Sequence, residues 1–270
     1  MPSNDTPYLG QASLRACLKV QGRVLHALLI REMLTRYGRN NIGFLWLFVE
    51  PMLFTIVVTI VWSATRSIHG SDIPIVAFAL TGYASMLMWR NMPGRCILAI
   101  SGNKSLLHHR LVKPLDVYFA RLLLEFAGSS TSFVILGIGF WAFDWLLPPE
   151  DALQVLGGWL LLGWFGVGLA LVLGALSERT ELVSRIWPPM SYFIFPFSGA
   201  GFLADGLPER IREIVLYLPM LNCNEYIREG YFGSKITAHY DLQYVVIFNL
   251  VLTLMGLGLV RSSDAVSEEE

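Results

Sequence analysis

The chain carries few charged residues for its length. Of its 270 residues, 15% are Asp, Glu, Lys or Arg and 54% are hydrophobic, whereas an ordinary soluble domain has about 25% charged residues. This composition excludes an ordinary soluble domain and indicates a membrane protein. The formal net charge of -1 says little by itself, because in a membrane protein the position of Lys and Arg relative to the spans is the informative quantity.

The sequence also lacks a complete motif for nucleotide, metal or catalytic chemistry. The run GNKS at 102–105 resembles the end of a phosphate-binding loop, but Asn separates Gly from Lys and no earlier Gly has the required spacing. His108 and His109 are neighbours, so on a helix they point about 100° apart, and no nearby residue completes a metal ligand set. We therefore expect no enzyme activity, no cofactor and no metal in this chain, and no nucleic-acid partner.

Cysteine is scarce, and the N-terminus has no cleavable-signal pattern. MPSNDTPYLG lacks a charged start followed by a short apolar core, so we expect the N-terminus to be retained. On the topology derived below, Cys17 and Cys96 lie in or near the cytoplasm and Cys223 lies outside. A single external thiol predicts that no disulfide forms.

Long apolar runs are the main positive feature. A helix needs about 20 mostly apolar residues to cross about 30 Å of hydrocarbon. The sequence predicts six such spans, at 42–65, 73–89, 117–143, 153–176, 186–203 and 242–260. An even number of spans places both termini on the same side of the membrane.

The distribution of Lys and Arg orients these spans. Basic residues gather before the first span and in the segment 95–113, so the positive-inside rule places both segments and both termini in the cytoplasm. The links at 66–72 and 147–151 are nearly free of basic residues, as external links should be. The external segment 204–241 is an exception, although Glu residues interleave with its basic residues.

Two segments outside the spans have amphipathic helical patterns. In 12–39, the residues Arg15, Lys19 and Arg23 share one helical face, which predicts a helix lying flat in the cytoplasmic membrane interface or docking on a soluble partner. In 204–241, two helical stretches broken at Pro219 are each too short to cross the bilayer. They either re-enter the outer leaflet or form an ordinary external cap.

Acidic and aromatic residues inside the spans are candidates for function. Glu50 and Glu125 fall at membrane depth, where charge is costly; a structural role competes, because Glu50 precedes a helix-bending Pro and Glu125 has Arg121 one turn earlier. Most aromatic residues should form interface belts, but those near mid-span can stack on sugars. The candidate substrate path comprises Trp46, Glu50, Tyr83, Trp89, Trp164 and Tyr192.

Four stretches resemble a known family. They are RYGRNNIGFLWLFVEP at 36–51, LTGYASMLMW at 80–89, NKSLLHHRLVKPLDVYFARLLLE at 103–125 and LPERIREIVLYLPMLNCNEYIREGYFG at 207–233. Together they resemble membrane subunits of type-2 ABC transporters that export polysaccharides, with capsular polysaccharide exporters first and O-antigen or teichoic-acid exporters next. The resemblance covers nearly the whole chain, which would then be one all-α membrane domain spanning 1–270.

The resemblance implies partners and a coupling helix. It implies a homodimer that joins two copies of a separate ATPase, which hold ATP and Mg, and that threads a polysaccharide outward between the protomers. The loop 99–116 matches the coupling helix that docks on the ATPase. The coupling residues would be Gly102, Asn103, Lys104, Leu107, His108, His109 and Arg110.

The external segment is expected to act as a gate. Short helices with mixed charge suit a mobile cap, and the resemblance adds a periplasmic co-polymerase-type protein as its partner. The candidate gate residues are Pro208, Arg212, Tyr217, Pro219, Glu225 and Arg228. Two alternatives remain open, namely a type-2 ABC exporter of a lipid-linked glycan, small drug or lipid, and a membrane-embedded glycan-processing enzyme.

Overall fold

The computed structural model describes residues 14–37, 45–65, 73–107 and 112–267, and these residues form helices and turns without a strand. The helices are α1 (Leu14–Tyr37), α2 (Trp46–Thr65), α3 (Ile75–Cys96), α4 (Lys104–Leu107), α5 (Pro114–Ala142), α6 (Ala152–Arg179), α7 (Glu181–Ile194), α8 (Glu209–Val215), α9 (Pro219–Phe232) and α10 (Leu242–Ser267). The predicted all-α fold is confirmed for this part of the chain.

Four of the described helices are long and apolar enough to cross a membrane by themselves. The qualifying stretches are Trp46–Ala64, Pro114–Ala142, Ala152–Arg179 and Leu242–Ser262. They coincide with the first, third, fourth and sixth predicted spans. The second predicted span falls on α3, and the fifth falls on α7.

Helix α7 differs most from the sequence-based span. It has 14 residues, a length of about 21 Å at about 1.5 Å per residue, and it begins before the predicted start at 186. The chain then continues as a 3-10 turn, Phe195–Phe197. The predicted span extended to 203 because the prediction followed apolar composition. Composition does not show where the backbone leaves the helix.

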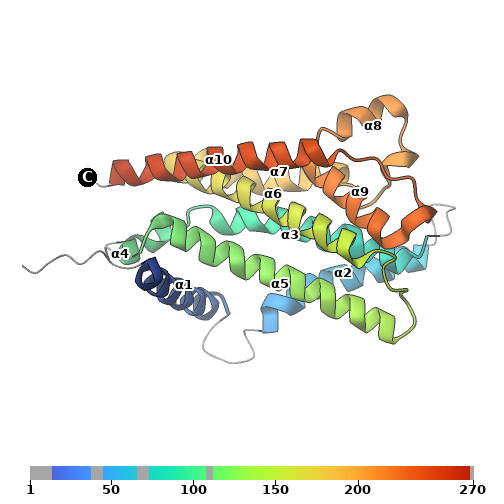
Figure 1. Cartoon of the computed structure of the whole chain (residues 1–270), viewed down its shortest axis with the longest axis horizontal. Helices are drawn as coiled ribbons and strands as arrows, with labels where there is room; N and C mark the ends of the chain where they lie inside the picture. Colours follow the sequence, from blue (N-terminus) through green and yellow to red (C-terminus); the bar gives the residue numbers. More distant parts are fainter. Residues whose placement is uncertain (1–13, 38–44, 66–72, 108–111, 268–270) are drawn as a thin grey trace, which may run out of the picture.

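The long helices pack side by side; α6 runs in the same direction as its neighbours α3 and α10, whereas α5 runs in the opposite direction (Figure 1). The short helix α4 and the end of α10 lie at one end of this bundle, and α8 and α9 lie at the other end (Figure 1). Helix α6 runs through the centre and packs against α3, α9 and α10. Close approach depends on small residues, because a Cβ at Gly166 would lie 2.5 Å from Met92 Sδ and one at Gly174 would lie 2.6 Å from Tyr118 Cε1.

Helix α1 packs against α5 through its less polar side. Arg15, Lys19 and Arg23 are exposed, as the basic face predicts, and Leu28 is buried on the opposite side. Gln21 donates a hydrogen bond to the Asp116 carboxylate at the start of α5. A helix is therefore present at Leu14–Tyr37, within the segment 12–39, and its contacts hold it near the α4 end of the bundle (Figure 1).

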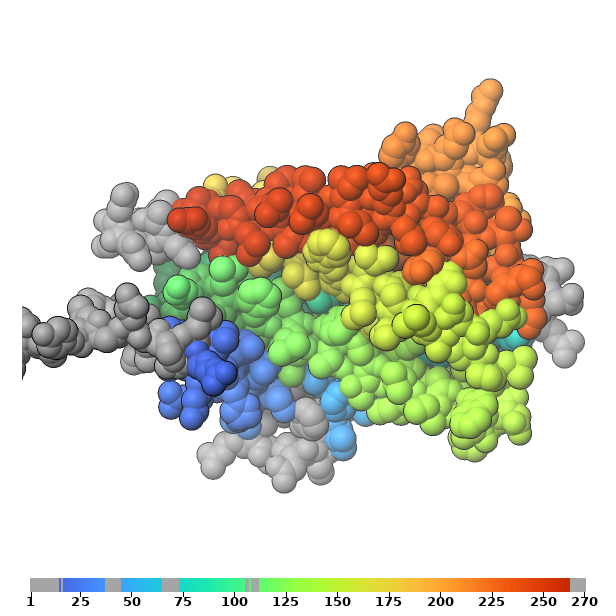
Figure 2. All heavy atoms as spheres, viewed as in Figure 1, coloured from blue at the N-terminus to red at the C-terminus, as the bar shows by residue number. Residues whose placement is uncertain are grey.

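The predicted external helices are very different from each other. Pro219 is the first residue of α9, in agreement with the predicted break. Helix α8 has 7 residues and stands out from the bundle (Figure 2), with Ile211 and Ile214 exposed; Tyr217, in the turn that follows, is exposed as well. Helix α9 has 14 residues, most of them buried, and it packs against α6 and α3. Of the two, α8 has the exposed position expected of a cap.

Candidate functional site

The segment after α3 matches the position of the expected coupling helix. Leu98 has a positive φ of 52°, so the chain turns sharply after α3 ends at Cys96. A 3-10 turn at Ser101–Asn103 and the short helix α4 follow. We call Ser101–Leu107 the coupling segment. The further candidates His108, His109 and Arg110 lie outside the described residues.

The end of α6 holds the start of this segment. The Glu178 carboxylate accepts hydrogen bonds from the backbone N–H groups of Ile100 and Ser101, at 2.8 and 3.1 Å. Ser177 Oγ accepts a hydrogen bond from the Leu98 N–H at 2.9 Å. A carboxylate also suits the free N–H groups at the start of a helical turn. The coupling segment is thus attached to α6 by side-chain acceptors, which the sequence analysis did not identify.

Helix α1 holds the same segment from the other side. Asn103 is 4% exposed; its Nδ2 donates to the Ala99 carbonyl at 2.8 Å, and its Oδ1 accepts from Arg31 Nη1 at 2.6 Å. Gly102 and Lys104 are exposed, and Leu107 is half-buried. Asn103 therefore positions the segment internally, whereas Gly102 and Lys104 lie at the surface.

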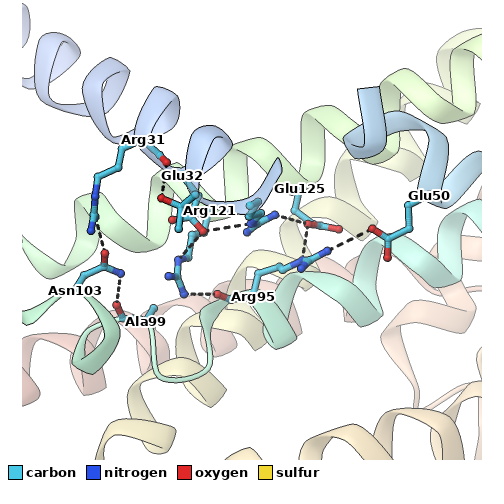
Figure 3. A network of polar contacts seen from close by, with 10 residues as sticks. Arg31, Glu32, Glu50, Arg95, Ala99, Asn103, Arg121 and Glu125 are labelled. Carbon is cyan, nitrogen blue, oxygen red and sulfur yellow. Dashed lines mark hydrogen bonds and ion pairs between the residues drawn. The ribbon is translucent and has the colours of Figure 1, made fainter. Parts of the chain in front are cut away.

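A group of ionised side chains joins α1 to α2, α3 and α5 next to the coupling segment (Figure 3). We call these side chains the charge cluster: Glu32, Arg36, Glu50, Arg95, Arg121 and Glu125. The Glu125 carboxylate is 5% exposed and lies 3.2 Å from Arg36 Nη1 and 3.1 Å from Arg95 Nε. Its two arginine partners come from α1 and α3, so this buried carboxylate connects three helices.

Glu32 completes the cluster on α1. It lies 3.2 Å from Arg36 Nε and 3.1 Å from Arg121 Nε; the latter contact is an ion pair without hydrogen-bond geometry. Arg121 Nη1 donates to the Arg95 carbonyl at 2.8 Å. The cluster contains three carboxylates and three guanidinium groups, so its formal charges balance.

The pairing expected for Glu125 was wrong. The sequence placed Arg121 one helical turn before Glu125, but Arg121 pairs with Glu32 on α1, and Glu125 pairs with Arg36 and Arg95. Packing of α1 on α5 brings Glu32 within reach of Arg121. That packing is not visible in the spacing along α5 alone.

An open groove of about 600 Å³ lies beside the charge cluster on α2. Its lining residues are Arg36, Trp46, Glu50, Leu53, Phe54 and Val57. The side chain of Glu50 is 64% exposed there, with its Oε2 atom 3.9 Å from Arg95 Nη2. The structure thus brings two candidate path residues, Trp46 and Glu50, to one groove with a cation at its edge.

The other candidate path residues lie in different surroundings. Tyr83 on α3 is half-buried, and its ring centroid is 5.6 Å from those of Phe54, Trp62 and Phe195, so it connects to the groove through Phe54. Tyr192 is 61% exposed, with the Arg90 guanidinium 3.8 Å from its ring centroid.

Trp89 and Trp164 do not lie at this groove. Trp89 is 1% exposed within the hydrophobic core. Trp164 is half-buried on α6 and donates from Nε1 to Thr253 Oγ1 on α10 at 3.0 Å. Their roles in a substrate path stay untested, and both have packing roles in the fold.

The candidate gate residues divide into an exposed and a buried set. Pro208 and Tyr217 are exposed and Arg212 is half-buried near α8, whereas Pro219, Glu225 and Arg228 are buried in α9. This difference follows from the contacts of α9 with α6 and α3.

The buried residues of α9 hold the loop before α8. Arg228 donates to the carbonyls of Phe202 and Ala200, at 2.5 and 3.0 Å, and its guanidinium lies 3.9 Å from the Phe78 ring centroid. Glu225 accepts from the Ala204 N–H at 3.1 Å. Burial lowers the pKa of Arg228 to about 10 and raises the pKa of Glu225 above its usual value. Arg228 and Glu225 therefore fix the segment 200–204 in place.

Thiol labelling should reveal this burial. Cys223 on α9 is buried, and burial raises the pKa of its thiol to about 12, so almost no reactive thiolate exists at neutral pH. A maleimide should modify the exposed Cys17 and leave Cys223 unmodified until the protein is unfolded. Mass spectrometry of labelled peptides checks this expectation. Rapid modification of Cys223 at pH 7 in the folded protein would contradict the placement of α9.

Known sequences share this organisation over nearly the whole chain. The family model described as ABC-2 type transporter matches residues 23–232. The capsule polysaccharide export inner-membrane protein CtrC of Neisseria meningitidis serogroup A is 44% identical over 97% of this chain and 99% of its own. CtrC of serogroup B is 43% identical over 93% of this chain and 95% of its own. The capsule polysaccharide export inner-membrane protein BexB of Haemophilus influenzae is 40% identical over 94% of this chain and 96% of its own. The chain therefore belongs to the ABC-2 type transporter family.

Proposed function

We propose that this chain is the membrane subunit of an ATP-driven exporter that moves a capsular-type polysaccharide across the bacterial inner membrane. Relatives that match almost end to end are named for capsule polysaccharide export. The proposed mechanism is supported by two attachments of the coupling segment. Glu178 links it to α6, and Asn103 links it to α1. A movement imposed on this segment passes directly into two helices.

The proposed assembly is a homodimer with two copies of a separate ATPase, which bind ATP and Mg. Six spans are proposed, namely the four strongly apolar helices together with α3 and α7. Both termini are then proposed to be cytoplasmic, and the end of α10 lies on the side of α4 (Figure 1). Gly102 and Lys104 are exposed, and we propose that both contact the ATPase, Lys104 through its positive charge.

The proposed polymer path follows the groove on α2. Trp46 and Tyr83 present aromatic faces on which sugar rings stack, and Glu50 presents a carboxylate that accepts hydrogen bonds from hydroxyl groups. At the opposite end of the bundle, Ile211 of α8 and Tyr217 in the turn after α8 are exposed. We place the contact with a periplasmic co-polymerase-type protein there, and we propose that α8 moves as the outer gate while α9 stays fixed.

Gene deletion with glycan analysis tests this function. Cells without the chain should retain a polysaccharide inside that complemented cells secrete, and the tagged chain should co-purify with an ATPase. Normal polysaccharide secretion in the deletion strain would contradict the proposal. Loss of a small lipid or drug efflux in place of polymer secretion would favour the alternative type-2 exporter.

Replacing Glu178 by Gln should weaken the coupling of ATP hydrolysis to export. A Gln side chain has one carbonyl oxygen, so it accepts from one of the two N–H groups that Glu178 now binds, at a cost of about 1 kcal/mol in local stability. The polymer secreted per ATP hydrolysed should fall while the dimer and the ATPase contact persist. The matched control is Glu181→Gln on the surface of α7, where the side chain is 81% exposed. An unchanged ratio in Glu178→Gln would show that this attachment does not transmit movement.

A further inference from the structure

Arg95 lies between the buried and the exposed parts of the charge cluster. Its Nε atom is 3.1 Å from Glu125 Oε2, and its Nη2 atom is 3.9 Å from Glu50 Oε2 (Figure 3). The side chain of Glu125 is 5% exposed and that of Glu50 is 64% exposed. One guanidinium group therefore connects the packed interior to the open groove on α2.

The backbone of the same residue leads to the coupling segment. The Arg95 carbonyl accepts from Arg121, which pairs with Glu32 on α1. One turn further along the chain, the Ala99 carbonyl accepts from Asn103, whose side chain also accepts from Arg31 on α1. Helix α1 thus contacts the coupling segment directly through Arg31, and it reaches the last turn of α3 through Arg121 and Glu125 of α5.

The two ends of the Arg95 bridge differ in strength. Glu125 is buried and held by two guanidinium groups at short distances, so breaking that end is costly. The Glu50 end is long and open to solvent, where an ion pair contributes little. A ligand rich in hydroxyl groups that enters the groove competes for the Glu50 carboxylate and leaves the Glu125 end intact.

We propose that Arg95 is a positioning residue that transmits occupancy of the α2 groove to the coupling segment. A sugar hydroxyl bound to Glu50 removes one of the two carboxylates from Arg95, and the last turn of α3 then shifts against α1 and the coupling segment. The linkage is reciprocal, so a coupling segment moved by the ATPase alters the affinity of the groove for the polymer. This inference rests on the proposed function and adds a route between its two sites.

Arg95→Lys separates this role from a purely structural one. The single ammonium group of Lys keeps the charge balance next to Glu125, but it lacks the fork that contacts two carboxylates at once. The test uses the complete transporter with its ATPase in proteoliposomes, with and without capsular polysaccharide prepared from the source cells. The stimulation of ATP hydrolysis by polymer should fall about fivefold or more in Arg95→Lys, the lower range of coupling between linked sites. The unfolding temperature and the dimer should stay close to wild type.

Two further variants make the test decisive. Arg185→Lys alters an exposed pair with Glu181 on α7 and should keep the wild-type stimulation. Glu50→Gln combined with Arg95→Lys should lose no more stimulation than Arg95→Lys alone, because both changes interrupt one route. Additive losses, full stimulation in Arg95→Lys, or failure of Arg95→Lys to fold would each overturn the inference. A wild-type complex that neither secretes polymer nor responds to it would overturn the proposed function itself.

Discussion

Replacing Glu125 by Ala is expected to lower the free energy of unfolding by about 3 to 5 kcal/mol, the range for breaking a buried ion pair by removing one partner. Glu125 is 4% exposed and pairs with Arg36 and Arg95. Without its carboxylate, two guanidinium groups remain close together in the interior with Glu32 as the nearest buried acid. The contacts of α5 with α1 and α3 should loosen as a result.

Thermal unfolding of the detergent-solubilised protein measures this effect, with gel filtration to report aggregation. Glu181→Ala is the matched control, because that carboxylate also pairs with an arginine but is 81% exposed, and surface pairs contribute little. Equal unfolding temperatures for Glu125→Ala and the control would show that the charge cluster does not support the fold.

Replacing Gly82 by Ala should destabilise the α9 end of the bundle by about 3 kcal/mol, the upper part of the usual range for overpacking. A Cβ at Gly82 would lie 2.4 Å from the Ala200 carbonyl oxygen and 2.7 Å from Arg228 Nη2. That carbonyl accepts the Arg228 hydrogen bond, so it has little freedom to move away. The substitution should displace the segment 200–204 and expose Cys223 to thiol reagents.

Gly139→Ala is the control for this substitution, because a Cβ there meets no atom within 4 Å. Ala is favoured over Gly in a helix by about 1 kcal/mol, so this control should unfold at the same or a higher temperature. The comparison uses thermal unfolding together with maleimide labelling of Cys223. A Gly82→Ala protein with wild-type stability and an unreactive Cys223 would contradict the close contact of α3, α9 and segment 200–204.

The sequence predicted those parts of the fold that depend on local pattern. The length of an apolar run located α2, α5, α6 and α10, and the break at Pro219 followed from the absence of a proline N–H. The basic face of α1 followed from helical spacing. The end of α7 could not be predicted from local pattern, because the sequence stays apolar through the turn after Ile194.

Contacts between distant segments could not be predicted in this way. Glu125 pairs with residues 89 and 30 positions away, while the sequence offered only the neighbour Arg121. The burial of α9 was also missed, because Glu225 and Arg228 appear as surface charges in a helical pattern. Arg228 donates to a backbone carbonyl of segment 200–204, and Glu225 accepts from the backbone N–H groups of Ala204 and His239. Backbone partners of this kind cannot be recognised from the residue types in the sequence. The attachment of the coupling segment to Glu178 was missed for the same reason.

We propose that this chain converts ATP hydrolysis on a separate protein into polysaccharide export. Uptake of capsular polysaccharide into inverted proteoliposomes that contain this chain, with or without its ATPase, tests this conversion. We expect uptake only when both proteins and hydrolysable ATP are present, with less polymer per ATP in Glu178→Gln. Uptake that needs no ATPase, or an intact complex that hydrolyses ATP and moves no polysaccharide, would contradict the proposal.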